Sequence, residues 1–460
     1  MTLLKRRKKT ISTVYIIYSV SVQTQKRIIA SHIKIKTKMK VKNLLLAGLA
    51  VAAMTACSND EIVDNGVQTT GEEASMSINL KFADEGTRAV TSGTTDPGEI
   101  VERDATTVTA IIEYPNTNKR LVFKNLTLVN DGNGNKYTTE KFAVEAASGV
   151  KVYAIINNKN ENITATTNLS ELKVGKQTLP NTGLAYIAKT VAEDNAFLMS
   201  GSVEGVNIKG GDSENVAPIT VTRVAAKLDE QTVLSTAFPV TATDYNIEGK
   251  ISVKLSGFSF SNLSSDSYVF GANSSVEGWL QTYQVAGTDP ADGAYEWITD
   301  KITYCLENNN TANPTRVHYK GQVCIDDEPI IGDFYIRAIS LDGGVTTTYR
   351  LFKTWNDLKD FYKSDAIDKL DNTDRTALRK YGIMKYVGGI CYYEANITTE
   401  SPEPAKISVV RNNWYQLTVK SISKIGLPTP AQEPTPDETM LTITTTVADW
   451  VIQVNDFDLH

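Results

Sequence analysis

Short segments in which apolar and polar residues alternate recur along most of this chain, and they restrict it to a β fold. Met76–Phe82 is a clear case, because its four apolar side chains fall on one face of an extended strand. Clusters of Gly, Asn and Pro, such as the one at 130–135, separate these segments as turns. Short strands at regular spacing are typical of a sandwich or barrel. The other predicted strands are 107–114, 120–128, 136–144, 150–157, 219–228, 250–260, 316–324, 332–340, 345–352, 386–395, 414–422 and 440–454.

Three segments carry helix signals within this pattern. Thr354 and Asp357 form a capping box ahead of apolar residues at helical spacing. A second short helix is predicted over Asp374–Tyr381, with Gly382 as its natural end. A third is predicted near Leu184–Glu193. We therefore expect an all-β dominated fold with short helical insertions.

The last predicted strand, Met440–Val454, follows a Pro-rich spacer at Pro428–Pro436 and changes phase in its middle. The apolar residues of its first part lie on one parity, and those of its second part lie on the other. A bulge or sharp bend near Ala448 and Asp449 would reconcile the two parts. The two sets are Leu441, Ile443 and Val447, and Trp450, Ile452 and Val454.

An export signal precedes the strands. Lys40 and Lys42 form a basic start, and Leu44–Ala53 is an apolar run of about ten residues, too short for a stable membrane anchor. The run ends in Met-Thr-Ala before Cys57, which resembles a lipobox. We expect the Cys57 thiol to take a diacylglyceryl group, with palmitate among the acyl chains, before cleavage makes it the new N-terminus. A plain secretory signal with a chance cysteine is the alternative.

Three short regions surround this signal. Residues 39–56 form the signal peptide itself, and residues 57–75 are polar and acidic, as in a flexible tether. Residues 1–38 carry ten Lys/Arg and no acid. They are either a long basic extension or upstream sequence translated from a start codon placed too early. The second interpretation is favoured, because Met39 alone begins a complete signal peptide.

Export changes the charge of the chain. Residues 1–56 hold twelve of the 47 Lys/Arg and none of the 53 Asp/Glu, so the remainder has 35 against 53, a net charge near −18. Phosphate binding needs the opposite sign, which disfavours a nucleic-acid partner. About 400 residues remain, enough for two or three domains with their own cores.

The sequence predicts no catalytic residue, no metal site and no cofactor. After residue 56 the only histidines are His318 and His460, which disfavours a zinc site or a His-based triad. Asp131–Asn135 offers oxygen ligands as a calcium loop does, but Lys136 stands where that loop needs Gly. Three further cysteines either include one disulfide, with one thiol left over, or are small buried thiols. They are Cys305, Cys324 and Cys391.

Five motifs, taken together, resemble the fimbrillins of Bacteroidetes, specifically the branch of the major subunit of the short fimbrium. The Y-C-L-E-N sequence within Thr303–Asn308 and the R-N-N-x-Y-x-L-x-V strand at Arg411–Val419 are two of them. The matches run from the lipobox to the last strand. The acidic residues after Cys57 also resemble a surface-export signal of lipoproteins in this phylum. The other motif segments are Gly149–Asn157, Phe197–Gly201 and Arg223–Leu228.

The resemblance implies two transthyretin-like β-sandwich domains, one over 76–222 and the other over 223–460. It also implies assembly by strand exchange. In this process a protease cuts a loop after an arginine, the first strand leaves, and the C-terminal strand of another subunit fills the open groove.

Carried over by position, the removable strand is 76–82 and the donor strand is 440–454. The cut falls between Arg88 and Ala89, with Arg103 as the fallback. The apolar residues of the removable strand are Met76, Ile78, Leu80 and Phe82.

The resemblance therefore predicts a non-enzymatic shaft subunit of a cell-surface fimbrium that supports adhesion and biofilm formation. Its partners would be copies of itself in a head-to-tail polymer, anchor and tip subunits, an Arg-specific or trypsin-like protease, and host or bacterial surface ligands. The precursor would be lipid-anchored to the outer membrane. The alternative is a tip or accessory subunit, or a monomeric lipoprotein that captures glycan. Its candidate stacking residues would be Trp279, Trp297 and Trp355.

Overall fold

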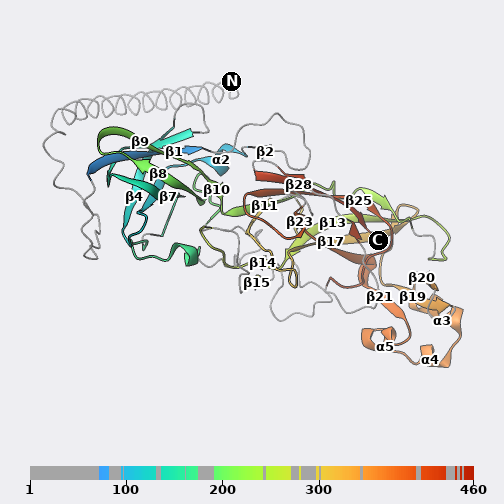
Figure 1. Ribbon diagram of the computed structural model, residues 1–460. Coiled ribbons are helices and arrows are strands. Elements are labelled where there is room, and N and C mark those ends of the chain that lie inside the picture. The colour runs from blue at the N-terminus through green and yellow to red at the C-terminus, as the bar shows by residue number, and fades with distance from the viewer. Residues whose placement is uncertain are drawn as a thin grey trace, which may run out of the picture. The chain divides into compact units, whose positions relative to one another are not determined.

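Strands predominate among the residues that the computed structural model describes, as Figure 1 shows. Among the residues that it describes, no helix has the length and apolar character needed to cross a membrane. The described residues are 72–81, 95–96, 98–130, 136–160, 162–174, 191–241, 245–270, 279–280, 297–299, 302–341, 346–399, 406–430, 441–442, 446–447 and 450–459.

The first nine-stranded sheet system is built from the N-terminal half of the described chain. Its strands are β1 (Glu73–Lys81), β3 (Thr107–Glu113), β4 (Arg120–Asn130), β5 (Lys136–Thr139), β6 (Phe142–Glu145), β7 (Ala147–Ile156), β8 (Met199–Ile208), β9 (Gly211–Thr220) and β10 (Thr222–Arg223). Their order is β10-β8-β7-β3-β4-β5-β1-β6, with β9 beside β1.

Strand β4 joins the two parts of this system because it changes partners along its length. Its first part pairs with β3, and its last three residues pair with β5. The register with β3 shifts between Val108 and Ala110, and Asn125 in β4 takes a left-handed conformation with φ 56°. A bulge of this kind bends a strand, so that one strand serves two sheets.

A second nine-stranded system and a five-stranded sheet hold most of the remaining strands. The nine-stranded system contains β2 (Thr95–Asp96), β11 (Ala225–Glu230), β14 (Leu263–Ser264), β15 (Trp279–Leu280), β16 (Thr303–Leu306), β25 (Asn413–Ile422), β26 (Leu441–Thr442), β27 (Thr446–Val447) and β28 (Trp450–Leu459). The five-stranded sheet contains β12 (Ala237–Pro239), β13 (Ile251–Ser261), β17 (Arg316–Ile325), β18 (Glu328–Pro329) and β22 (Ile390–Asn396). Short strands β23 (Thr398–Thr399) and β24 (Lys406–Ile407) pair with each other.

The helices are short. An N-terminal one, α2 (Ile100–Arg103), follows β2, and two single-turn 3-10 helices occur at Leu169–Glu171 and Val387–Gly389. The others belong to residues 334–386, which we call the helical insertion and which gather at one place in Figure 1. Its elements are β19 (Phe334–Leu341), β20 (Thr346–Phe352), α3 (Trp355–Tyr362), α4 (Asp365–Asp368), α5 (Arg375–Arg379) and β21 (Ile383–Tyr386).

The predicted helix signals at Thr354 and Asp374 are confirmed. The Asp357 backbone N–H donates to Thr354 Oγ1 at 3.1 Å, and the Thr354 N–H donates to Asp357 Oδ2 at 2.9 Å, which completes the capping box of α3. Asp374 caps α5 by accepting from the Ala377 N–H at 2.9 Å. After α5, Gly382 has φ 68°, a conformation that glycine adopts without a steric penalty.

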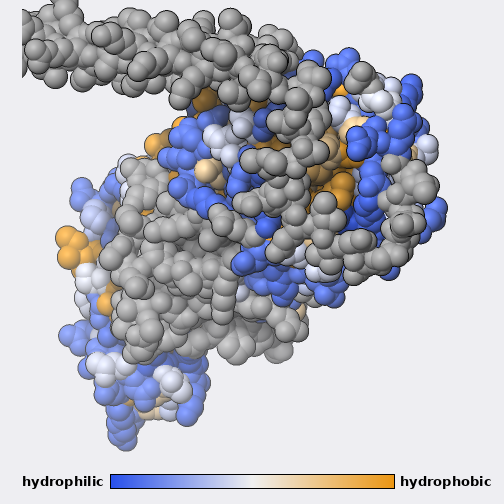
Figure 2. Space-filling model, turned by 90° about the vertical axis from the view of Figure 1, so that its left-hand side faces the viewer, coloured by the Kyte–Doolittle hydropathy of each residue, from blue (hydrophilic) through white to orange (hydrophobic). Residues whose placement is uncertain are grey.

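Apolar side chains form one large core and one small one. The large core runs through both sheet systems, and the small one lies in the helical insertion. On the face of the molecule in Figure 2, much of the described surface is hydrophilic, and hydrophobic residues show as separate areas. The small core consists of Tyr335, Phe352, Leu358, Ile367, Leu378 and Ile383.

Three predicted strands differ from the structure. The segment 136–144 is two strands, β5 and β6, because they pair with different parts of β1. The segment 219–228 is divided among β9, β10 and β11, which have different partners. The predicted last strand is three strands, and the antiparallel pairing of β27 with β28 reverses the chain where a bulge or bend was expected. The helix predicted near Leu184–Glu193 falls mostly outside the described residues. The all-β dominated class itself is confirmed.

Glu230, the last residue of β11, gives the fold a pH dependence. Burial raises the pKa of its carboxyl to about 7 from an ordinary value of 4.5, even though Thr232 and Tyr319 donate hydrogen bonds to it. The folded state therefore holds this proton more firmly than the unfolded state. The free energy of unfolding should fall by about 2–3 kcal/mol between pH 4.5 and 7 through this group alone.

Urea unfolding at a series of pH values measures this effect. Glu230→Gln cannot ionise, so the variant should gain stability over the wild type as the pH rises from 4.5 to 7. The exposed Glu248 provides a matched control, and Glu248→Gln should follow the wild-type curve. Parallel curves for the wild type and Glu230→Gln would contradict the assignment.

Candidate functional site

Strand β1 lies inside its sheet and has partners on both sides. On one side it pairs antiparallel with β5 and β6, and on the other it pairs parallel with β9. Side chains reinforce the backbone pairing. Thr139 Oγ1 accepts from the Ile78 N–H at 2.9 Å, and Asn215 Nδ2 donates to the Ser75 carbonyl at 2.9 Å. Removing β1 would therefore leave unpaired backbone groups on both flanking sides.

The predicted apolar face of β1 is buried. Met76, Ile78 and Leu80 are each 0% exposed and belong to the large core. Burying each such side chain contributes roughly 1.5–3 kcal/mol. The strand is thus held by its backbone ladder and by its side chains together.

The other predicted site residues fall partly within the described structure. Arg103 ends α2, Leu441 lies in β26, and Val447 lies in β27. Strand β28 contains Trp450, Ile452 and Val454, and it pairs parallel with β25 and antiparallel with β2, β26 and β27. The predicted residues outside the described structure are Cys57, Phe82, Arg88, Ala89 and Ile443.

Helix α2 carries a buried carboxylate that sequence reasoning did not identify. Glu102 is 0% exposed, and its Oε1 lies 2.6 Å from the Nζ of Lys227, which is 2% exposed. The Tyr304 hydroxyl donates to the same oxygen, and the other carboxylate oxygen accepts from the Glu99 N–H at 2.8 Å. The Arg223 Nε donates to the Glu102 carbonyl at 2.7 Å. The contacts with Lys227, Tyr304 and Arg223 tie α2 to residues far along the chain, whereas the Glu99 contact caps the helix locally.

The electrostatics of Glu102 follow from these contacts. Burial alone would raise the pKa of its carboxyl, but the Lys227 charge and the hydrogen bonds from Lys227 and Tyr304 hold the pKa below its ordinary value. Burial and the nearby carboxylate raise the pKa of Tyr304, so its hydroxyl stays protonated and donates. The Glu102 carboxyl is therefore ionised at neutral pH, and Lys227 is its ion-pair partner.

Strand β25 closes the other side of this cluster. The Lys227 Nζ lies 4.1 Å from the ring centroid of Trp414, and the Trp414 Nε1 donates to Asp229 Oδ2 at 2.9 Å. Asn412, just before β25, accepts from the Arg223 N–H at 3.1 Å. An ammonium over an indole face is a favourable cation–π contact when it is desolvated.

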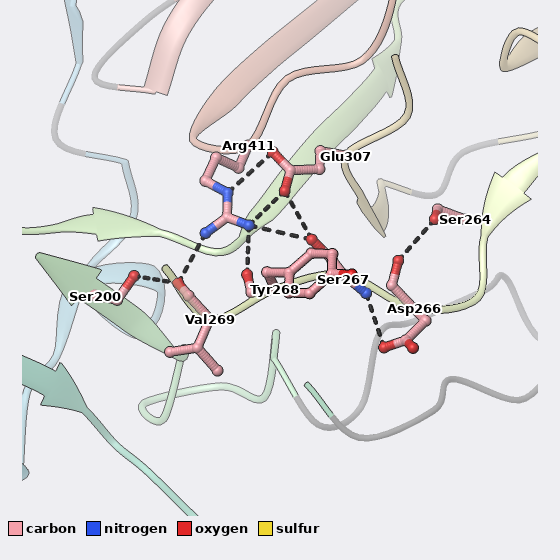
Figure 3. A network of polar contacts seen from close by, with 8 residues as sticks. All are labelled: Ser200, Ser264, Asp266, Ser267, Tyr268, Val269, Glu307 and Arg411. Carbon is pink, nitrogen blue, oxygen red and sulfur yellow. Dashed lines mark hydrogen bonds and ion pairs between the residues drawn. The ribbon is translucent and has the colours of Figure 1, made fainter. Parts of the chain in front are cut away.

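A second network lies around Arg411, as Figure 3 shows. The Arg411 guanidinium forms an ion pair with Glu307 through two nitrogens and donates to the carbonyls of Tyr268 and Val269. The Val269 carbonyl also accepts from Ser200 Oγ at 2.6 Å. Ser200 lies in β8, and Arg411 begins the motif at Arg411–Val419. The Val269 carbonyl, which accepts from both, therefore connects the first sheet system to that motif.

These two networks explain four of the five motifs that carry the fimbrillin resemblance. Their residues, which lie far apart in the chain, make contact with one another or with Glu102. Phe197 completes the set, because its ring meets the Tyr304 ring edge-on with centroids 5.0 Å apart. The motif residues involved are Phe197, Ser200, Arg223, Lys227, Tyr304, Glu307, Arg411, Asn412 and Trp414.

The described residues include histidine, cysteine and carboxylate side chains, the types that bind metals or take part in catalysis. No group of three metal-ligating side chains occurs among them. His318 Nε2 lies 2.7 Å from Ser261 Oγ, but both residues are buried, and burial lowers the pKa of the imidazole to about 3. The three cysteines for which two interpretations stayed open are buried free thiols: Cys305, Cys324 and Cys391.

The region of the Arg411 motif matches a known family. Residues 384–456 match the family model of the major fimbrial subunit protein type IV, fimbrillin, C-terminal. The C-terminal part of the chain is fimbrillin-like. The resemblance seen in the motifs is thus confirmed for this region. No curated protein sequence matches the chain.

Several solved structures also match the chain, among them the following three. A fimbrilin (fimA) of Porphyromonas gingivalis has 15% identity and a TM-score of 0.43, and the match covers 84% of this chain and 98% of that one. A candidate cell adhesion protein of Bacteroides eggerthii has 13% identity and a TM-score of 0.43, and the match covers 86% of this chain and 100% of that one. The tip fimbrial protein Mfa3 of Porphyromonas gingivalis has 13% identity and a TM-score of 0.36, and the match covers 84% of this chain and 100% of that one.

Truncating one member of the buried pair should destabilise this protein. Glu102→Ala leaves the Lys227 ammonium buried without its carboxylate, which should cost about 3–5 kcal/mol of unfolding free energy. Replacing both partners with apolar residues, Glu102→Leu with Lys227→Met, should recover most of that loss. Urea unfolding at neutral pH measures all three proteins.

The exposed ion pair between Lys159 and Glu193 provides the control. Glu193→Ala should change the free energy of unfolding by less than about 1 kcal/mol, because exposed pairs are weak. Equal losses from Glu102→Ala and Glu193→Ala would show that burial of the first pair is not decisive.

Proposed function

We propose that this protein is the shaft subunit of a cell-surface fimbrium. In this proposal it is exported as a lipoprotein through Cys57, anchored to the outer membrane, and polymerised by protease-triggered exchange of β1 for the C-terminal strand of another subunit. The fimbrillin match over 384–456 supports a fimbrial subunit in general. The role in the shaft and the strand exchange are our inference from the architecture of β1.

The observation that carries the proposal is the position of β1. It comes first among the described strands, it lies between paired neighbours, and its apolar face is fully buried. A first strand with these properties can be lost by a single cut downstream, and its loss opens a groove inside a sheet. Refilling such a groove with four or five apolar side chains at roughly 1.5–3 kcal/mol each provides on the order of 10 kcal/mol. Strand addition is an established mode of protein recognition.

The buried pair favours Arg88 over Arg103 as the cleavage site. A cut after Arg88 leaves α2 on the retained chain, so Glu102 stays in contact with Lys227. A cut after Arg103 would place Glu102 on the departing fragment. The Lys227 ammonium would then remain buried without its partner, which is costly. The protein therefore tolerates the first cut much better than the second.

The donor would be the segment 440–454, and its present pairing must change before it is donated. Strand β28 is held between β25 and the strands β2, β26 and β27 of its own chain. A strand of one subunit that fills a groove in the next makes a heterologous contact that does not close on itself, which generates a filament.

The second candidate function is a tip or accessory subunit, or a monomeric lipoprotein that captures glycan. The pairing of β28 within its own chain favours it, because a subunit that never donates would keep that strand. The tryptophans predicted as candidate stacking residues give the glycan-capture role less support. Trp297 packs against Tyr392 with centroids 5.6 Å apart, and Trp355 packs against Tyr335 at 5.1 Å. The side chain of Trp279 lies outside the described structure.

Brief trypsin treatment of the full-length protein in detergent tests the shaft role. It should produce a new N-terminus at Ala89 and a ladder of oligomers on an unboiled denaturing gel. Arg88→Ala should abolish both, and Arg103→Ala should leave both unchanged. N-terminal sequencing identifies the cut.

Two results would count against the proposal in different ways. A trimmed product that stays monomeric would remove the shaft role and favour the tip or glycan-capture role. Resistance of the bond after Arg88, with oligomers forming all the same, would show that the cleavage site is elsewhere.

A chain that lacks residues 440–460 separates acceptance of a strand from its donation. After trypsin treatment it should stay monomeric, because it has no donor, yet it should take up a synthetic peptide of residues 440–454. A peptide with Ile452→Asp should bind at least about tenfold more weakly, since a carboxylate cannot enter an apolar groove without a large desolvation cost. Fluorescence anisotropy of the labelled peptides measures uptake, and equal uptake of the two peptides would exclude this segment as the donor.

A further inference from the structure

The helical insertion differs in charge from the rest of the chain. Residues 334–386 contain ten Lys/Arg and seven Asp, a net charge of +3. The remainder of the chain after residue 56 has 25 Lys/Arg against 46 Asp/Glu. A small basic element on an acidic protein is suited to an anionic ligand, because the two attract each other locally.

Two arginines of the insertion lie directly opposite each other. Arg337 in β19 and Arg350 in β20 are partners in the antiparallel register, so their side chains leave the same face of the sheet. That face also carries Tyr335 and Phe352, which belong to the small core beneath the helices. Like charges directly opposite one another are unfavourable in a sheet unless an anion lies between them.

Aromatic rings at the end of α3 hold both guanidinium groups in place. The Arg337 Cζ lies 4.0 Å from the ring centroid of Tyr362, and the Arg350 Cζ lies 4.0 Å from that of Phe361. The two rings are themselves edge-to-face, with centroids 5.0 Å apart. A stacked guanidinium keeps its N–H groups in its own plane, where they can donate to an oxyanion.

Neither arginine has a carboxylate partner among the residues that the structure describes. The Arg337 Nε donates to the Tyr381 carbonyl at 3.2 Å, and the Arg350 guanidinium makes no hydrogen bond with the described residues. Lys385 of the same insertion, in contrast, forms an ion pair with Asp333 at 2.9 Å. The pair of arginines is thus positioned and half-buried, and no carboxylate of the described residues neutralises its positive charge.

We propose that Arg337 and Arg350 bind the oxyanion groups of an acidic polysaccharide, with the ring of Phe361 against a sugar face. Phe361 is 51% exposed, so part of its ring is open beside the guanidinium that it holds. An aromatic surface next to paired guanidiniums fits a sugar ring that carries a carboxylate or a sulfate. This site goes beyond the role in the filament and does not depend on polymerisation.

The structure favours a glycan over an acidic peptide. A peptide that reached these arginines would most readily bind by adding a strand to β20, which is one of the two edges of its three-stranded sheet and carries Arg350. The outer side of β20 is partly occupied, because the Leu351 N–H donates to the Tyr245 carbonyl at 3.1 Å. The arginine side chains project from the face of the sheet, where a sugar can approach without backbone pairing.

Binding of the full-length protein in detergent to immobilised polysaccharides tests the site. Polygalacturonate presents carboxylates, heparin presents sulfates as well, and dextran is neutral. We expect salt-sensitive binding to polygalacturonate or heparin, the stronger of the two identifying the preferred group, and none to dextran. Arg337→Gln with Arg350→Gln should weaken it at least about tenfold, and Phe361→Ala should weaken it with no change in charge.

The matched control removes two positive charges elsewhere in the insertion. Lys353 and Lys369 are exposed, so Lys353→Gln with Lys369→Gln should change binding less than about twofold. Arg350→Lys keeps the positive charge but loses the planar guanidinium. It should therefore bind as weakly as the double variant Arg337→Gln with Arg350→Gln. Near-UV circular dichroism confirms that each variant is folded.

Four outcomes would overturn the proposal: no binding to either acidic polysaccharide, equal losses from the lysine and arginine double variants, full binding by the folded arginine double variant, or polyglutamate binding as tight as polysaccharide binding. The last result would assign the site to an acidic peptide. None of these outcomes bears on cleavage or polymerisation, so the shaft role stands or falls separately.

Discussion

The ion pair between Glu102 and Lys227 is the interaction on which the contact of α2 with the motif segments depends. Both charges are removed from water, so each is tolerated only because the other is present. Their contact fixes α2 against β11, and Tyr304 and Trp414 complete the enclosure from β16 and β25. The Arg411 network repeats the arrangement nearby with a guanidinium in place of the ammonium. The Glu102–Lys227 ion pair therefore ties α2 to β11, and the Arg411–Glu307 ion pair reinforces the antiparallel bridge between Asn308 and Val409.

Much of the fold can be predicted from the sequence, because alternation reports directly on burial. The segments at 107–114, 250–260 and 316–324 are strands β3, β13 and β17 with nearly the predicted bounds. Alternation does not report on partners. It therefore joined β5 to β6, although their ladder with β1 is interrupted between Thr139 and Phe142. It also ran β9, β10 and β11 together, although each has a different partner.

Alternation also predicted one part of the candidate site, the apolar face of β1, but neither the position of β1 in the sheet nor the buried Glu102. The buried face of Met76, Ile78 and Leu80 follows from a period of two, but the central position of β1 depends on distant strands that no local pattern specifies. Glu102 gave no local signal. It lies in a four-residue helix, and its partners Lys227 and Tyr304 are 125 and 202 residues away in the chain. A glutamate in a short polar stretch is ordinarily exposed, and only the tertiary contacts show otherwise.

The pairing of β1 also has a direction. Its neighbour β9 runs parallel to it, and β5 and β6 run antiparallel to it. A parallel ladder and an antiparallel ladder place their hydrogen bonds differently, so a strand inserted backwards would match neither side. Any strand that occupies this groove must therefore enter with its chain pointing one way. Every junction in a row of such subunits would share that sense, and the row would have a front and a back that differ chemically, so that it could lengthen at one end while the other stays fixed.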